Sequence, residues 1–335
     1  IGRRRTDTLQ ELFQDSERSI LSRLLSLISF PFFWRQNVVS YPSDKPEAAL
    51  YEAIYSLSQD SSEAFSLMRA VPDISSFSLS DAGVIGDVID KSAEDVFSRY
   101  SDYLACFSRD AMPYSILFPE SRYFPEEKGD YFPVIYASGN MKLLSSQRVT
   151  IIGMPRPSMQ GKTDTAKAVS YFAEHGVTIA VPLDSGVGLL ATKLALKAGA
   201  PVIAFLSTPL SGSESDEMME IQAEIFANGL LLSIFPPFQK SERWHVMIRN
   251  RFIASVSSSV FLAEEKDGGP AWSIFDKVLL NGGRAMLSSS MLEVPSYKWA
   301  RMRLESGALS YSSASDLRRI IPKAIHISEE PDLFS

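Results

Sequence analysis

The sequence predicts a mixed α/β protein in which an all-α N-terminal module precedes a doubly wound, mostly parallel sheet. Two features of the 335-residue chain lead to this fold class. Over roughly the first third of the chain, apolar side chains recur at three- and four-residue steps, which is typical of helices. After a Pro-rich connector at residues 112–130, short β-rich runs alternate with amphipathic stretches. That alternation is typical of a parallel sheet covered by helices on both faces.

The N-terminal module is expected to be helical throughout. A helix is predicted between residues 6 and 28, and further helices over 45–57, 61–70 and 93–106. The Ser/Asp-rich segment 71–83 is interpreted as a separator between helices. The most apolar run, residues 20–34, contains Arg23 and Pro31 and is shorter than the ~20 residues that a membrane span requires. We therefore expect a buried helix there and no membrane anchor.

The second part of the chain supplies the elements of the sheet in order. The predicted strands are 132–137, 148–153, 176–182, 201–206, 229–234, 256–264 and 284–287. The predicted helices between them are 163–174, 189–198, 215–227, 244–254 and 271–281. Right-handed crossovers then give an extended Rossmann-like domain that binds ligands at the carboxyl ends of its strands. We divide the chain into a helical module (1–112), this domain (113–325) and a C-terminal tail (326–335).

Composition limits the class of protein. The 45% apolar content excludes a mostly disordered chain, and the single Cys106 excludes a disulfide scaffold. One free thiol and no leading signal segment favour a reducing cytoplasm. The net charge of −7 argues against a protein that coats nucleic acid with its whole surface. A local basic groove stays open, because phosphate binding responds to the field of one patch.

The first candidate loop is IIGMPRPSMQGKT, residues 151–163. A strand ends at Gly153 and a helix opens at Gly161, so backbone N–H groups and the positive helix end can face an anion, helped by Arg156 and Lys162. The sequence argues against a phosphate-binding P-loop, because Arg156 stands where that motif needs glycine. The alternatives are an anion-binding loop and a simple strand–helix turn.

Two further loops follow the same strand–turn–helix pattern. In VPLDSGVGLLATK, residues 181–193, Gly186 allows close backbone approach, and Asp184 or Ser185 is expected to cap the helix. In AEEKDGGPAW, residues 263–272, Gly268 and Gly269 lead into a helix. The loop at residues 263–272 has the geometry of a loop that faces a phosphate. A solvated turn between strand and helix is an equally good interpretation.

The densest positive cluster lies in KSERWHVMIRNRFIA, residues 240–254. Arg249 and Arg251 diverge by about 200° on a helix, so we expect one to reach a ligand groove and the other to be structural. Trp244 has two interpretations, a platform for a nucleobase or part of the core. His245 is expected to be an ordinary polar residue.

Motifs of known catalytic sites are missing from the sequence. It contains no GxSxG elbow, no HExxH, no CxxC and no dinucleotide-binding GxGxxG, and its three histidines are widely spaced. The sequence therefore predicts neither an enzyme nor a metal site.

Taken in order, these loops resemble the DNA-processing protein A (DprA/Smf) family, whose core is an extended Rossmann fold. The resemblance covers about residues 118–321. It is carried by YFPEEKGDYFPVIYASGN (123–140), IGMPRPSMQG (152–161), GLLLSIFPP (229–237), HVMIRNRFIASVS (245–257) and LESGA (304–308). The pocket is partly rewritten: the family's arginine falls on Pro155, with Arg156 displaced by one, and the family's SGS loop is reduced to Gly268-Gly269-Pro270.

The resemblance implies a non-enzymatic, cofactor-free protein that binds single-stranded DNA in a positive groove. It also implies a homodimer that hands the strand to a RecA-type recombinase during natural transformation, with Asn250 and Glu264 holding the pocket. The residues expected at DNA phosphates are Gly153, Arg156, Ser158, Gly161, Lys162, Ser185, Gly186, Lys240, Arg243, Arg249, Asn250, Arg251, Gly268 and Gly269.

Two other hypotheses remain open at this point. One is a nucleotide-binding or nucleotide-cleaving protein on the same fold, favoured by the rewritten pocket and by the acidic pair Glu264 and Glu265. The other is a scaffold whose helical module binds a protein partner while the pocket has lost its function.

Overall fold

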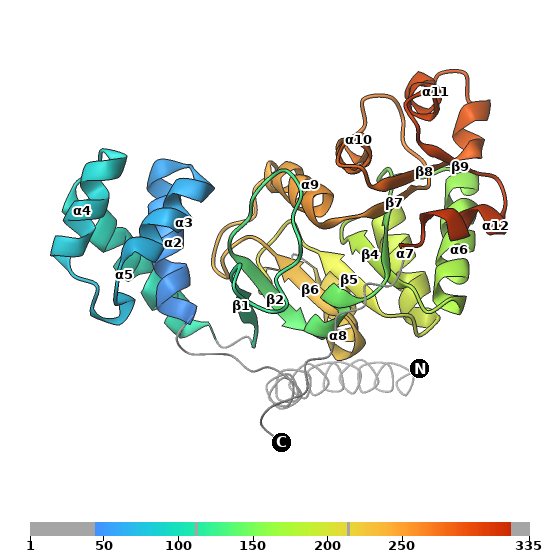
Figure 1. The fold of residues 1–335 in the computed structure, drawn as a ribbon. Coiled ribbons are helices and arrows are strands. Elements are labelled where there is room, and N and C mark those ends of the chain that lie inside the picture. Colours follow the sequence, from blue (N-terminus) through green and yellow to red (C-terminus); the bar gives the residue numbers. More distant parts are fainter. Residues whose placement is uncertain (1–43, 111–112, 213–214, 323–335) are drawn as a thin grey trace, which may run out of the picture.

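The computed structural model describes residues 44–110, 113–212 and 215–322 (Figure 1). The helix expected between residues 6 and 28, the apolar run 20–34 and the tail 326–335 lie outside these residues. None of the helices in the described part of the chain combines the length and the apolar character needed to cross a bilayer.

The helical module contains four α-helices within its described residues, α2 (Asp44–Ser58), α3 (Ser61–Ala70), α4 (Leu79–Ile89) and α5 (Ala93–Arg109). The helices predicted over 45–57, 61–70 and 93–106 are confirmed. Helix α4 was missed, because its first residues fall in the segment interpreted as a separator. Ser78 and Asp81 of that segment form a capping box that starts the helix.

One nine-stranded sheet forms the core of the second part, in the order β1-β2-β6-β5-β4-β3-β7-β8-β9. Strands β3 to β9 pair with one another in parallel, whereas β2 is antiparallel to both β1 and β6. The strands are β1 (Ser115–Leu117), β2 (Ile135–Gly139), β3 (Arg148–Ile152), β4 (Thr178–Pro182), β5 (Val202–Phe205), β6 (Leu230–Ser233), β7 (Ser259–Leu262), β8 (Arg284–Ser288) and β9 (Leu309–Tyr311). All predicted strands are confirmed, and β1 and β9 are additional three-residue strands at the two edges.

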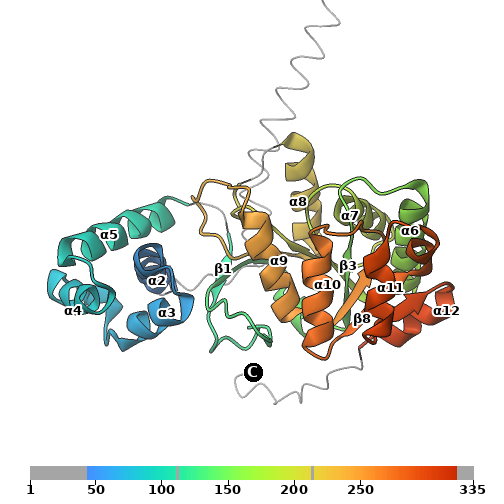
Figure 2. The ribbon, with the colours of Figure 1, turned by 90° about the horizontal axis from the view of Figure 1, so that it is seen from above.

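Helices cover both faces of the sheet, as predicted for a Rossmann-like fold. Residues of α6 (Met159–Glu174), α7 (Val187–Lys197) and α8 (Asp216–Asn228) belong to one apolar cluster, and residues of α9 (His245–Val256), α10 (Ala271–Leu280) and α11 (Lys298–Glu305) belong to the other. Figure 2 shows these two layers on opposite sides of the strands. Alternate strand residues enter each cluster: Ile151 packs with the first and Ile152 with the second. A short helix, α12 (Ala314–Leu317), follows β9.

The helical module lies beside the antiparallel edge of the sheet (Figure 1). Phe107 of α5 stacks on Tyr136 of β2 with ring centroids 6.0 Å apart, and the Tyr136 hydroxyl donates a 2.7 Å hydrogen bond to Glu52 of α2. Glu52 is buried, and desolvation raises its pKa to about 8. The contact between the two parts therefore contains a carboxyl group that stays protonated at neutral pH.

The sheet changes direction between β3 and β7. From β3 the chain proceeds outward through β4, β5 and β6, and it then returns to place β7 on the other side of β3. Such a switch point opens a crevice at the carboxyl ends of the strands, where doubly wound sheets bind their ligands. The loops that leave β3, β4 and β7 meet there.

Candidate nucleic-acid interface

Three loops are joined by backbone hydrogen bonds at the switch point. The Met154 N–H, after β3, donates a 2.8 Å bond to the Glu264 carbonyl after β7, and the Val187 N–H at the start of α7 donates a 3.3 Å bond to the Met154 carbonyl. Gly186 lies in the left-handed region with φ of 70°, and a Cβ there would collide with the backbone of Met154 and Pro155. Only glycine therefore permits this approach of the β4 and β3 loops.

Glu264 occupies the N-terminus of α6, where an external anion was expected. Its carboxylate accepts a 2.7 Å hydrogen bond from the Ser158 N–H, and the Ser158 hydroxyl accepts one of 3.1 Å from the Gly161 N–H. A Cβ at Gly161 would overlap the Glu264 carboxylate, so this glycine makes room for a side chain of the protein itself. The Tyr297 hydroxyl donates to the same carboxyl group at 3.4 Å. A carboxylate of the protein itself therefore lies at the positive end of α6.

Glu265 fills the Gly268–Gly269 loop in the same way. Its carboxylate accepts hydrogen bonds from the N–H groups of Lys266 (3.0 Å) and Ala271 (3.2 Å), and the residue is fully buried. Burial raises the pKa of Glu265, and these two donors oppose the shift. Gly269 packs against this carboxylate, whereas Gly268 is exposed.

Arg249 is a buried structural residue at the first turns of α9. It is 2% exposed, and it donates to Asp184 after β4 (2.9 Å) and to the side-chain oxygen of Asn250 (2.8 Å). The amide of Asn250 in turn donates to the Pro270 carbonyl at 3.4 Å. Desolvation raises the pKa of Asp184, although Arg249 opposes the shift. These contacts join the β4 loop, α9 and the loop after β7.

Asp184 and Ser185 do not cap α7. The N-cap is Gly186, and no side chain bonds to the first turn of the helix. Asp184 instead pairs with Arg249, whose guanidinium would otherwise be a buried, unpaired charge. Ser185 is exposed at the tip of the loop.

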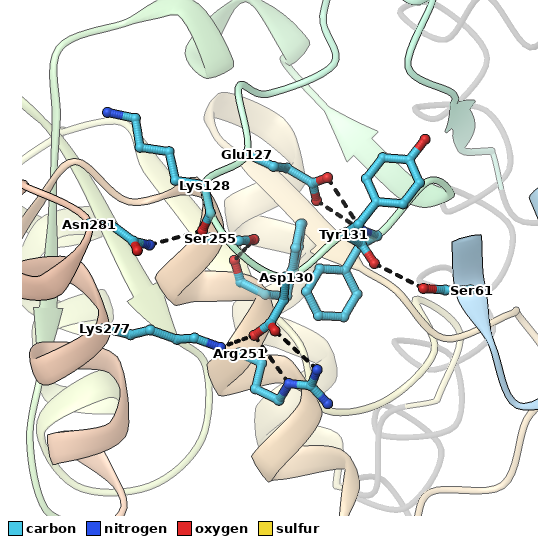
Figure 3. A network of polar contacts seen from close by, with 11 residues as sticks. Ser61, Glu127, Lys128, Asp130, Tyr131, Arg251, Ser255, Lys277 and Asn281 are labelled. Atoms are coloured by element: carbon cyan, nitrogen blue, oxygen red, sulfur yellow. Dashed lines mark hydrogen bonds and ion pairs between the residues drawn. The ribbon is translucent and has the colours of Figure 1, made fainter. Parts of the chain in front are cut away.

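Arg251 points away from Arg249, toward the connector that precedes β2. Its guanidinium donates two 3.1 Å hydrogen bonds to Asp130, and Lys277 of α10 pairs with the same carboxylate (Figure 3). Hydrogen bonding from Arg251, with Lys277 beside it, lowers the pKa of Asp130. The expected divergence of the two arginines is therefore observed, and both carry carboxylate partners.

Further bonds hold the connector against α3, α9 and α10 (Figure 3). The Lys128 N–H donates to the Ser255 carbonyl at 2.8 Å, and the Asn281 amide donates to the Lys128 carbonyl at 2.9 Å. The Ser61 hydroxyl of α3 donates to the Tyr131 carbonyl at 3.2 Å. Arg251 is thus part of the attachment between the helical module and the sheet domain.

Exposed cations surround the switch-point loops. Among the described residues, five of them at this edge form no ion pair and no side-chain hydrogen bond: Arg156, Lys162, Lys240, Arg243 and Lys266. The acids of the β7 loop, in contrast, are engaged, since Glu264, Glu265 and Asp267 all accept backbone N–H groups. The edge therefore presents free positive charge although the chain is acidic overall.

Trp244 and His245 occupy opposite environments at the start of α9. Trp244 is 49% exposed, so its interpretation as a core residue is wrong. His245 is fully buried, stacked on Phe235 with ring centroids 4.0 Å apart, and burial lowers its pKa. His245 is therefore a packing residue, held neutral by its surroundings.

The sequence analysis marked Glu265 only as one of an acidic pair, and it did not predict how Glu265 and three other residues shape this edge. The roles of Glu265, Tyr297, Asp267 and Asp130 depend on contacts between distant segments, and no local motif marks them. A weak signal exists for Glu265 and Asp267, because acids next to a Gly-Gly turn before a helix commonly bond the free N–H groups there. No group of three or more His, Cys, Asp or Glu is placed to hold a metal ion in the segments that the structure covers.

The fold and the edge define a class of protein, a doubly wound α/β domain with a cationic ligand edge at its switch point. Comparison with known proteins gives the family. The model of the family described as DNA recombination-mediator protein A matches residues 115–317, which is more than half of the chain. The chain belongs to this family, and the resemblance drawn from the loop motifs is confirmed.

Relatives and solved structures agree with this assignment. The chain is 25% identical to DNA processing protein DprA of Bacillus subtilis over 191 residues, 57% of this chain and 64% of the relative. It is 32% identical to protein Smf of Synechocystis over 136 residues, 39% of this chain and 34% of that relative. The chain thus spans less than two thirds of the length of these relatives.

Among solved structures, DNA processing protein A from Streptococcus pneumoniae aligns with a TM-score of 0.69 at 20% identity. The alignment covers 82% of this chain and 98% of that one. The Helicobacter pylori protein, whose structure concerns its single-stranded DNA binding mode, aligns with a TM-score of 0.54 at 22% identity, over 62% and 94% of the two chains. At these identities the likeness shows the fold.

Proposed function

We propose that this protein binds single-stranded DNA along the carboxyl edge of its sheet and acts as a DNA-processing, recombination-mediator protein. The observation that carries the proposal is the set of exposed cations without acidic partners on the loops that leave β3, β6 and β7. Parallel strands lie about 4.8 Å apart, so these loops extend along the edge for several nucleotides of an extended strand. Family membership supports the same role.

The residues divide into two groups in this proposal. Arg156, Lys162, Lys240 and Arg243 contact phosphates, because their charges are exposed and unpaired among the described residues. Ser158, Ser185 and Gly268 lie exposed on the loops after β3, β4 and β7, and they supply further polar or backbone contacts. Most of the remaining residues of the predicted set keep the loops in position: Gly153, Gly161, Gly186, Arg249, Asn250 and Gly269. Arg251 instead holds the connector through Asp130.

The finer parts of the hypothesis also stand as proposals. The protein is non-enzymatic, works in the cytoplasm as a homodimer, and delivers the strand to a RecA-type recombinase during natural transformation. Its chain is organised as a helical module (1–112), a Rossmann-like domain (113–325) and a tail (326–335). Family membership supports these proposals. The carboxylates of Glu264 and Glu265 also lie at the N-termini of α6 and α10, where the phosphates of a nucleotide substrate would otherwise bind.

A nucleotide-binding role is less well supported by the same geometry. A nucleotide on a doubly wound sheet places its phosphates on helix N-termini at the switch point. Glu264 already bonds the N–H of Ser158, the N-cap residue of α6, and Glu265 bonds the N–H of Ala271 in the first turn of α10. A phosphate group would have to displace these carboxylates, whereas a DNA backbone can use the exposed side chains outside them.

Salt-dependent binding of an oligonucleotide tests the proposal. The full chain should bind a fluorescent 15-nucleotide oligothymidine, with affinity that falls steeply as salt rises, because each neutralised phosphate releases about 0.7 counterion. Replacing Arg156, Lys162, Lys240 and Arg243 by alanine should reduce the slope of log affinity against log salt by up to about 3. The matched control removes the exposed Lys91 and Lys197, which lie away from this edge, and should leave the slope unchanged. Absence of binding at low salt would overturn the proposal.

A further inference from the structure

Trp244 is an exposed aromatic side chain in the segment that joins β6 to α9, beside two of the exposed cations. It is the N-cap residue of α9 and lies four residues after Lys240 and next to Arg243. Half of its surface, 49%, is exposed, whereas Trp272 of α10 is 1% exposed. Tryptophan supplies a large apolar surface that usually gains free energy by burial. Its exposure here therefore needs an explanation.

The indole is backed by rigid packing. Its ring lies edge to face with His245, with centroids 4.3 Å apart and planes at 86°, and His245 is stacked on Phe235 at 4.0 Å. His245 is fully buried and accepts a 3.3 Å hydrogen bond from the Glu242 N–H, so the support is itself fixed. One side of the indole is thus covered by the protein while the rest faces solvent, and a ligand ring would meet a surface that is already ordered.

The neighbours of Trp244 match a single strand better than a second protein. Met247 follows at i+3 on the same helix and is 60% exposed, which extends the apolar surface by one side chain. Lys240 and Arg243 precede it in the chain, and neither forms an ion pair among the described residues, although the exposed Glu242 lies between them in sequence. Proteins that bind single strands combine aromatic rings, on which bases stack, with cationic side chains, which contact the phosphates.

We infer that Trp244 is a stacking platform for a nucleobase of the bound strand, with Lys240 and Arg243 holding the phosphates on either side of that base. This inference rests on the proposed function and adds contact with a base to it. Since every base has a π-face, such a platform tolerates any sequence and distinguishes a single strand from a duplex, whose bases are stacked on one another.

The test compares a normal oligothymidine with an abasic oligomer of the same length, which keeps the phosphates and lacks the bases. Trp244→Ala should weaken binding of oligothymidine by about tenfold and leave binding of the abasic oligomer and the salt slope unchanged. Trp244→Phe should keep most of the affinity. Quenching of tryptophan fluorescence by oligothymidine should occur in the wild type and largely disappear in Trp244→Phe.

The outcomes separate the inference from the proposed function. If oligothymidine binds with steep salt dependence but Trp244→Ala has no effect, the stacking platform is wrong and the proposed function stands. If Trp244→Ala weakens both oligomers equally, the residue contributes no base contact and the inference is overturned. If the variant changes the oligomeric mass in solution without changing affinity for DNA, Trp244 belongs to a protein interface. If the wild type binds neither oligomer at low salt, both proposals fail.

Discussion

The carboxylate of Glu264 lies 2.7 Å from the backbone nitrogen of Ser158, and it accepts the hydrogen bond that an anionic ligand would accept at the start of α6. The two residues are 106 positions apart in the chain. Their contact closes the switch point between β3 and β7 and leaves the exposed cations around it to meet a ligand. This relationship is the reason why we propose that the edge binds the backbone of a strand rather than a phosphate group buried on a helix end.

Removing the carboxylate of Glu264 should destabilise the protein and open an anion position. Glu264→Ala leaves the Ser158 N–H without its partner and removes a negative charge from a helix N-terminus, which should cost about 1–3 kcal/mol in urea unfolding. Inorganic phosphate should then raise the unfolding free energy of the variant more than that of the wild type, because it binds the vacated site. Glu293→Ala, at an exposed position, serves as the control. Equal phosphate effects in both proteins would contradict this account of α6.

Arg249 and Arg251 should differ strongly in their contribution to stability. Arg249→Met removes a buried guanidinium and leaves Asp184, whose side chain is 38% exposed, without its partner, so the unfolding free energy should fall by about 1–3 kcal/mol. Arg251→Ala removes a half-exposed ion pair and should cost less than about 1 kcal/mol. Denaturant unfolding at fixed pH measures both.

The double variant Arg249→Met with Asp184→Leu provides the control for the buried pair. It replaces both charges by apolar groups and should recover most of the loss seen in Arg249→Met alone. A double variant that is no more stable than the single one would show that the arginine acts through other contacts than this ion pair.

Asp130 should stabilise the attachment of the connector only above acidic pH. Its folded-state pKa is lowered by Arg251 and Lys277, below the ordinary value of about 3.9. The stabilisation is therefore present above that ordinary value and is lost as the pH falls through the lowered, folded-state pKa. Asp130→Asn should reduce the unfolding free energy by about 1 kcal/mol at pH 7, and the difference from the wild type should shrink toward pH 3. A difference that is constant between these pH values would contradict the ion-pair assignment.

Glu52 should produce the opposite dependence on pH. Burial raises its folded-state pKa to about 8, above the unfolded value of about 4.3. The folded protein therefore binds a proton that the unfolded chain releases, and stability falls as the pH rises from about 4.5 to 8. Glu52→Gln keeps an oxygen for the Tyr136 hydroxyl and should flatten this part of the curve, so that the variant is more stable than the wild type at pH 8 and similar at pH 4.5. Parallel stability curves for the two proteins would show that Glu52 does not titrate in this range.

The sequence alone predicted the fold class, because its signal is local. Parallel strands buried on both faces appear as short apolar runs, and the helices between them have an apolar stripe. Strands β1 and β9 were not predicted, because each is only three residues long and too short to show a periodic pattern. Helix α4 was not predicted, because serine and aspartate are frequent both in loops between helices and in helix caps. Only the hydrogen bonds between Ser78 and Asp81 show that this segment caps a helix.

By itself the sequence also determined the family and the loops that surround the edge, since those depend on residue types at fixed spacing along the chain. Only the tertiary structure decided which charges are free. Arg249 meets Asp184 across 65 residues, Arg251 meets Asp130 across 121, and Glu264 reaches Ser158 across 106. The contact of Glu264 with Ser158 exists because the order of the strands brings β3 and β7 side by side. The pairing of a charge depends on distance in space, which spacing along the chain does not contain.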